Sequence, residues 1–124
     1  MVRLLVVDDE SEICEFLRSF FEERNYTVFV AHSGKQALEE MKKTNPQIVL
    51  LDIKMPDMDG VQALREIKLQ HPRVKVIMVT AIETRDKIEE CLRLGADNYI
   101  TKPLSLEYLE TDVREKIESI SKTK

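Results

Sequence analysis

The chain has 124 residues, of which 43% are hydrophobic and 34% are charged, a size and composition that suit one soluble domain with a hydrophobic core. The net charge of −4 excludes a bulk attraction to nucleic acid or to an anionic membrane. No apolar run approaches the roughly 20 residues of a membrane helix and no signal peptide precedes the first strand, so we expect a cytoplasmic protein.

The first half of the chain alternates between short apolar runs and amphipathic segments. The run at 3–7 is almost continuously apolar, which predicts a strand buried on both faces. Apolar residues at helical spacing then predict a helix over 12–23. A brief β-branched strand at 27–31 precedes a helix at 33–43, which opens with a capping box formed by serine and, three residues later, glutamine.

The second half repeats the alternation. The predicted helix that ends before Gly95 carries Ile88, Cys91 and Leu92 on its inner stripe, and this glycine suits the position after a helix. Strict alternation predicts an α/β fold, a (βα)5 doubly wound parallel sheet of five strands with helices on both faces. One domain is expected over 1–120, followed by a polar tail at 121–124. The elements of this half are predicted at 47–51, 60–70, 75–80, 84–94, 98–100 and from about 105 onward.

The cysteines and histidines do not form a recognisable site. Cys14 and Cys91 lie far apart in amphipathic helices, which favours buried free thiols over a disulfide or a metal site. His32 and His71 stand near predicted loops and are interpreted as solvated side chains.

Polar side chains follow four of the predicted strands at the point where each strand ends. They are Asp8 and Asp9, Asp52, Thr80 and Lys102. Any one of them could simply mark the end of a strand. In a parallel sheet, however, ligands bind beyond the carboxyl ends of the strands, so all five side chains can converge on one site.

Three clustered carboxylates require a cation or a bound proton. Two carboxylates about 4 Å apart repel by roughly 4 kcal/mol at an effective dielectric constant near 20. Oxygen ligands favour Mg²⁺, and the lack of His or Cys at these strand ends argues against zinc. A carboxylate at a strand end can attack phosphorus and form an aspartyl phosphate, with Mg²⁺ neutralising charge. Lys102 and the Thr80 hydroxyl would then contact the other phosphoryl oxygens.

Five blocks in order, "VVDDE", "LLDIKMPDMDG", "VIMVTA", "GADNYI" and "TKPL", make the chain resemble a receiver domain of bacterial two-component response regulators, of the chemotaxis-regulator type. The resemblance covers essentially the whole chain, and the blocks together are very specific. It implies a flavodoxin-like strand order, 2-1-3-4-5. It also implies a phosphoprotein that is not otherwise an enzyme and that catalyses only its own phosphorylation and dephosphorylation.

The resemblance assigns the phosphorylation chemistry residue by residue. Asp52 would be the phosphoryl acceptor. Asp8, Asp9 and Asp52 would hold Mg²⁺ together with the backbone carbonyl of Lys54. The phosphodonor would be a phosphohistidine on a sensor histidine kinase or on a histidine phosphotransfer protein.

The resemblance also assigns a switch. Thr80 and Tyr99 are similar to the family's switch pair, and Lys102 to its catalytic lysine, joined to Pro103 by a cis peptide bond. The surface made by the fourth helix, fifth strand and fifth helix would be the face for an output partner or a homodimer. Simpler interpretations remain for three of these residues: Tyr99 as core packing, Thr80 as a strand residue and Pro103 as an ordinary loop proline.

Two positions flank the approach of water to the phosphoryl group in receivers that resemble this chain: Lys54 and Ile82. Isoleucine cannot hold a water molecule, and Lys54 is either a partner of a phosphoryl oxygen or a solvated loop lysine. We therefore expect a long-lived phosphoryl group.

Two alternatives belong to other classes of protein. A receiver-like adaptor that is never phosphorylated would tend to lose the acid pair or the lysine, and both are present here. A Mg²⁺-dependent aspartyl phosphatase of the haloacid-dehalogenase type would need a second acid two residues after Asp52, where this chain has Lys54.

Overall fold

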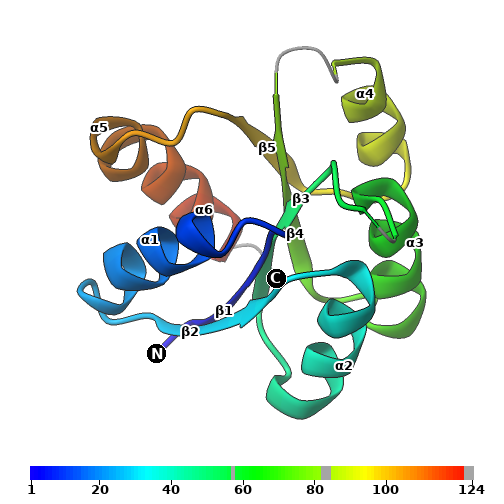
Figure 1. The fold of residues 1–124 in the computed structure, drawn as a ribbon, viewed down its shortest axis with the longest axis horizontal. Coiled ribbons are helices and arrows are strands. Elements are labelled where there is room, and N and C mark those ends of the chain that lie inside the picture. The colour runs from blue at the N-terminus through cyan, green and yellow to red at the C-terminus, as the bar shows by residue number, and fades with distance from the viewer. Residues whose placement is uncertain (57, 82–84, 122–124) are drawn as a thin grey trace.

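The structure is a computed structural model, and it describes residues 1–56, 58–81 and 85–121, with the side chains of residues 85 and 121 excepted. Its centre is one sheet of five parallel strands in the order β2-β1-β3-β4-β5 (Figure 1). The predicted α/β fold with a flavodoxin-like strand order is therefore confirmed. The strands are β1 (Arg3–Val7), β2 (Thr27–Ala31), β3 (Ile48–Asp52), β4 (Lys75–Thr80) and β5 (Asn98–Thr101).

Helices cover both faces of the sheet. Figure 1 shows α1 together with the C-terminal helical segments on one face, and α2, α3 and α4 on the other. The helix predicted from about residue 105 consists of three consecutive segments, the middle one of which is π-helical. The helical elements are α1 (Ser11–Glu22), α2 (Gly34–Thr44), α3 (Gly60–Gln70), α4 (Arg85–Arg93), α5 (Leu106–Tyr108), η2 (Leu109–Val113) and α6 (Arg114–Ser121).

The core consists of two apolar layers separated by the sheet. In β1, Leu4 and Val6 face the layer under α1 and α6, whereas Leu5 and Val7 face the layer under α2 and α3. All four are almost completely buried, which explains why the sequence of this strand is continuously apolar instead of alternating.

Local signals place the ends of the helices. The Ser33 hydroxyl accepts a hydrogen bond from the Gln36 N–H at 3.1 Å, while the Gln36 side chain accepts one from the His32 N–H at 2.7 Å. The capping box thus closes one residue before the N-cap rather than on it. Gly95, after α4, has a φ of 107°, a conformation that favours glycine.

Several finer expectations need correction. Leu92, expected on the inner stripe of its helix, is 45% exposed, whereas Ile88 and Cys91 are buried. The interpretation of His71 as solvated holds only in part, because the residue is half-buried and its Nε2 atom is shielded from solvent, with no hydrogen-bond partner among the described residues. The helix α6 includes Ser121, the first residue of the predicted tail, and 122–124 lie outside the described residues.

Two further observations concern the cysteines and the membrane. Cys14 and Cys91 are buried free thiols, as predicted. In the part of the chain that the structure describes, every helix is too short or too polar to cross a bilayer.

Candidate functional site

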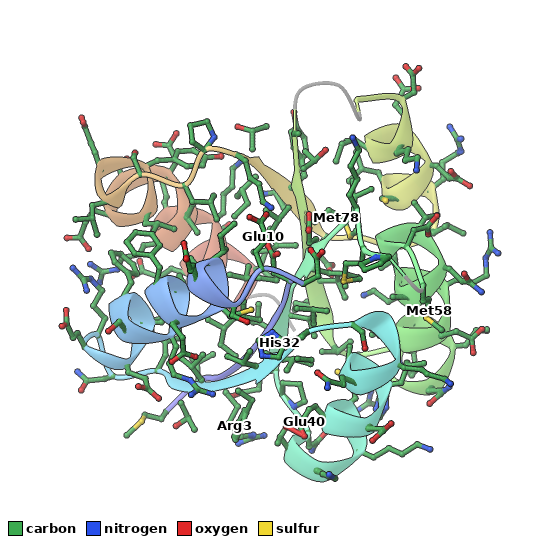
Figure 2. The ribbon with its side chains drawn as sticks, in the orientation of Figure 1. Arg3, Glu10, His32, Glu40, Met58 and Met78 are labelled. Atoms are coloured by element: carbon green, nitrogen blue, oxygen red, sulfur yellow. The ribbon has the colours of Figure 1, made fainter. Side chains whose placement is uncertain are left out.

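A pocket of about 380 Å³ lies at the carboxyl edge of the sheet, where β1, β3, β4 and β5 end. It brings together five residues that the sequence predicted as site residues, and Asp8 lies buried beside them. Glu10, which Figure 2 labels, is an additional member just beyond the end of β1. The lining residues are Asp9, Glu10, Asp52, Ile53, Lys54, Thr80, Ala81 and Lys102.

Asp52 is held rigidly at the end of β3. The following residue, Ile53, donates its N–H to the Val79 carbonyl at 3.1 Å, and the Gly60 N–H donates to the Ile53 carbonyl at 2.7 Å. A Cβ on Gly60 would lie 2.3 Å from the Asp52 carbonyl oxygen. Only glycine therefore lets the loop return this close to the strand end, and Asp52 is left only 5% exposed.

Asp8 is fixed by groups from β2, from α1 and from the turn that joins β1 to α1. Its N–H donates to the carbonyl of Ala31 at the end of β2, and its carbonyl accepts from the Cys14 thiol of α1 at 3.2 Å. One carboxylate oxygen accepts the Glu10 N–H at 2.9 Å. Asp8 is only 2% exposed.

The ammonium group of Lys102 lies close to three carboxylates. The Lys102 Nζ lies 3.2 Å from Asp8 Oδ2, 3.5 Å from Glu10 Oε1 and 3.7 Å from Asp52 Oδ2. The Lys102 N–H donates to the Thr80 carbonyl at 2.8 Å, and the peptide bond from Lys102 to Pro103 is cis. The backbone of β4 and β5 thus aims the ammonium group into an acidic site that it does not fully neutralise.

The pKa values reflect this imbalance. The pKa of Asp52 is raised to about 6, chiefly by burial and also by the charges of Asp8 and Asp9, while Lys102 acts in the opposite direction. Burial also raises the pKa of Asp8. For Lys102, burial lowers the pKa, but the facing Asp52 and Asp8 outweigh it, so this pKa lies above its usual value. Lys102 therefore stays protonated, but its single positive charge does not balance the negative charges of the neighbouring carboxylates.

The carboxylates of Asp8, Asp9 and Glu10 can place one oxygen each within 4.8 Å of one another. Such oxygen donors suit a hard divalent cation such as Mg²⁺, and the raised pKa of Asp52 shows that added positive charge would stabilise the site. Glu10 was missed by the prediction, which considered the residues at the strand ends. The run "VVDDE" held the signal, since it presents three consecutive acids.

The predicted switch residues differ in their exposure and in their relation to the pocket. Thr80 is 3% exposed and lines the pocket, and its hydroxyl donates to the Ala81 carbonyl at 2.9 Å. Tyr99 is 39% exposed and is not among the lining residues. Lys116 of α6 contacts it twice, with Nζ 2.8 Å from the Tyr99 carbonyl and 5.2 Å from the ring centroid. Ile82 lies outside the described residues.

Comparisons with known proteins agree with this geometry. A family model described as "Response regulator receiver domain" matches residues 4–114. The transcriptional regulatory protein ZraR of Escherichia coli strain K12 is 37% identical over 109 residues, which are 88% of this chain and 25% of ZraR, so the chain spans about a quarter of that relative. Sporulation initiation phosphotransferase F of Bacillus subtilis strain 168 is 36% identical over 112 residues, 90% of each protein.

A solved structure shares the fold over its full length. The CheY-like response regulator receiver domain protein from Methanospirillum hungatei JF-1 superposes with a TM-score of 0.88 at 31% identity, and the match covers 98% of each chain.

Proposed function

The chain belongs to the family of response regulator receiver domains of two-component systems, and from this premise we propose that Asp52 accepts a phosphoryl group in a Mg²⁺-dependent reaction. The observation that carries the proposal is the buried Asp52 carboxylate, which shares a pocket with the Lys102 ammonium group, the Thr80 hydroxyl and acidic residues. We further propose that 1–120 form the receiver domain.

Asp52 supplies the nucleophile. Its carboxylate oxygen attacks phosphorus, so that an O–P bond to Asp52 forms while the bond from phosphorus to the donor nitrogen or oxygen breaks. The attack requires the ionised carboxylate, which predominates above a pH of about 6. The rigid end of β3 holds this oxygen in place, which lowers the entropic cost of the reaction.

Lys102 and Thr80 stabilise the charge that arrives with the phosphoryl group. The Lys102 ammonium lies 3.7 Å from the Asp52 carboxylate, close enough to pair with a phosphoryl oxygen added to it. The Thr80 hydroxyl, which now donates to a carbonyl at the pocket wall, would donate instead to another phosphoryl oxygen. These two groups provide the positioned electrostatic partners that phosphoryl transfer needs.

The acids at the end of β1 would hold Mg²⁺. Asp8, Asp9 and Asp52, with the backbone carbonyl of Lys54, form the proposed ligand set, and Glu10 adds an oxygen donor at its rim. When bound, the ion neutralises the negative charge of the transferred group and of the carboxylates around it. Without such charge, Asp52 remains harder to ionise than an ordinary aspartate.

The proposed donor is a phosphohistidine on a sensor histidine kinase or on a histidine phosphotransfer protein, and the proposed place of action is the cytoplasm, where a kinase has access to ATP. The relative from Bacillus subtilis is by name a phosphotransferase of sporulation initiation, which favours a relay. The chain would catalyse only its own phosphorylation and dephosphorylation.

The output face proposed is that of α4, β5 and the C-terminal helix. Leu92, Tyr99 and Leu106 are exposed large hydrophobic residues of these elements, and they would contact an output partner or a second copy of the chain. Phosphorylation would draw the Thr80 hydroxyl toward the phosphoryl group and let Tyr99 turn inward, which changes this face.

The phosphoryl group is proposed to be long-lived. Lys54 is exposed and lines the pocket, where it can cover the approach of water, and the sequence places Ile82, which offers no hydrogen bond, at the second flanking position. A slow loss of phosphate suits a relay or a sustained transcriptional signal.

Intact-mass measurement after incubation with a small acyl phosphate and Mg²⁺ tests the proposal. We expect one phosphate on the natural chain and on the control Asp112→Asn, whose aspartate is exposed and outside the pocket, but none on Asp52→Asn. Absence of any adduct would favour the adaptor, and steady turnover of phosphate esters would favour the phosphatase. Labelling of Asp52→Asn at the natural level would refute the acceptor.

A further inference from the structure

A second cavity, of about 520 Å³, lies at the opposite edge of the sheet from the acidic pocket. Its walls come from the start of β1, the segment between α2 and β3, the turn between α3 and β4, and the end of α6. Figure 2 labels Arg3 and Glu10, which stand at opposite ends of β1, roughly a strand length apart. The volume is in the range of small-molecule sites.

The charges in this cavity have one sign. Arg3, Arg73 and Lys75 line it, and none of the described lining residues is an aspartate or a glutamate. This is unexpected in a chain whose net charge is −4. Acidic groups thus gather at one edge of the sheet and basic groups at the other.

Backbone hydrogen bonds place Arg3 and Lys75 on either side of Gln47. The Gln47 N–H donates to the Arg3 carbonyl at 2.9 Å, and the Lys75 N–H donates to the Gln47 carbonyl at 3.0 Å. The Arg3 Nε donates to the Asn45 carbonyl at 3.0 Å, which orients the guanidinium group. The cavity is therefore formed before any ligand binds.

Among the described residues, the three cations of the cavity have no carboxylate partner. Within residues 1–56, 58–81 and 85–121, no carboxylate lies within 4.0 Å of the charged nitrogens of Arg3, Arg73 or Lys75, whereas Lys68 nearby is paired with Asp97 at 3.2 Å. Clustered like charges are unfavourable without a counter-charge. Arginine in particular presents a planar fork of donors that matches phosphate and carboxylate groups.

His71 provides a second kind of polar group. It lines the cavity, and its Nε2 is shielded from solvent with no hydrogen-bond partner among the described residues. Because this Nε2 atom is shielded from solvent, His71 contributes to the cavity wall and is not counted among the groups that would pair with a ligand. Apolar residues such as Val2 and Ile48 complete the walls, so an organic skeleton can be accommodated as well.

We propose that this cavity binds a small oxyanion with at least two negative charges, carried by phosphate or carboxylate groups. Arg3, Arg73 and Lys75 would pair with the anionic oxygens. The site is separate from the acidic pocket, so binding requires neither Mg²⁺ nor a functional Asp52.

The test is a ¹⁵N NMR titration of the whole chain with citrate and, separately, with pyrophosphate, at constant ionic strength and without Mg²⁺. We expect a saturable change in chemical shift confined to the backbone amides of the non-proline residues within 2–3, 45–48 and 71–76. Response to both probes would identify charge as the determinant, and response to one alone would identify the carboxylate or the phosphate group. Either outcome supports the site.

Matched variants separate a site from general charge attraction. Arg73→Gln with Lys75→Gln should weaken binding at least about tenfold, because two charge-assisted contacts are lost. Lys35→Gln with Arg65→Gln removes the same charge from exposed positions outside the cavity and should leave the affinity unchanged. The NMR spectrum itself reports whether each variant is folded, and Arg73→Lys should retain binding better than Arg73→Gln.

Three results would overturn the proposal. They are chemical-shift changes spread over surface lysines without saturation, changes confined to the acidic pocket, and equal weakening by the two double variants. The Asp52→Asn variant should no longer be phosphorylated but should still bind citrate or pyrophosphate. This result would show that the two sites function independently of each other.

Discussion

Replacing Asp52 with asparagine should stabilise the metal-free protein, even though it removes the proposed phosphoryl acceptor. The pKa of Asp52 is raised from 3.8 to about 6, chiefly by burial and then by the neighbouring acids. Raising a pKa by 1 corresponds to about 1.36 kcal/mol, so ionised Asp52 costs the folded state roughly 3 kcal/mol at neutral pH. Because a buried amide also has a desolvation cost, we expect a gain of about 1–3 kcal/mol in the free energy of unfolding.

The gain should depend on pH in one direction. Asp52 binds its proton more tightly in the folded chain than in the unfolded chain, so the folded state holds more protons between pH 3.8 and about 6. The free energy of unfolding of the natural protein therefore falls, relative to that of Asp52→Asn, as the pH rises through this window. The two proteins should be nearly equally stable below the window, and the difference should be complete above it.

Urea unfolding followed by circular dichroism, with a chelator present, measures this difference at a series of pH values. Asp112→Asn is the matched control, because Asp112 is exposed and its replacement should change the stability by less than about 0.5 kcal/mol. Addition of Mg²⁺ should narrow the gap, since the ion stabilises the natural protein by binding to it. A variant no more stable than the natural protein above pH 7, or a difference that does not change with pH, would refute the reasoning.

Three further outcomes are expected. Asp9→Asn should weaken both Mg²⁺ binding, measured by calorimetry, and phosphorylation, by about tenfold or more, and an unchanged affinity would reject the ligand set. Lys116→Met should favour the inward position of Tyr99 about two- to fivefold, because a cation–π contact worth about 0.5–1 kcal/mol is lost; ¹⁹F NMR of fluorotyrosine would show it, and an unchanged population would contradict it. Ile82→Glu with Lys54→Asn should speed the loss of phosphate at least about tenfold, which corresponds to lowering the activation barrier of hydrolysis by roughly 1.4 kcal/mol. An unchanged rate would contradict the idea that these two residues keep water from the phosphoryl group.

Local patterns in the sequence determined the elements and their order. The continuous apolar run of β1 predicted a strand buried on both faces, and Ser33 and Gly95 marked helix ends where the structure has them. These features depend on neighbouring residues and on hydrophobic periodicity, which a sequence displays directly. Strict alternation then required a parallel sheet, and a parallel sheet required Asp52 and Lys102 to meet at one edge.

The width of a buried helix face was decided by tertiary packing. Ile88, Cys91 and Leu92 share one apolar stripe in the sequence, yet Leu92 is 45% exposed and the other two are buried. Periodicity shows which way a helix faces, but the neighbouring elements determine how much of that face they cover. The inclusion of Glu10 in the acidic pocket was decided in the same way, by the position at which α1 begins after β1.

The strength of the interactions between charged residues is determined by the tertiary structure alone. The sequence shows which residues are charged, but the raised pKa of Asp52 comes chiefly from burial and then from the charge of Asp8, which only the folded chain brings close to it. Arg3 and Lys75 are distant in sequence and come to line one cavity only through the register of β1, β3 and β4. Charges act through space and burial changes their strength, so their effect depends on distances that only the folded chain defines.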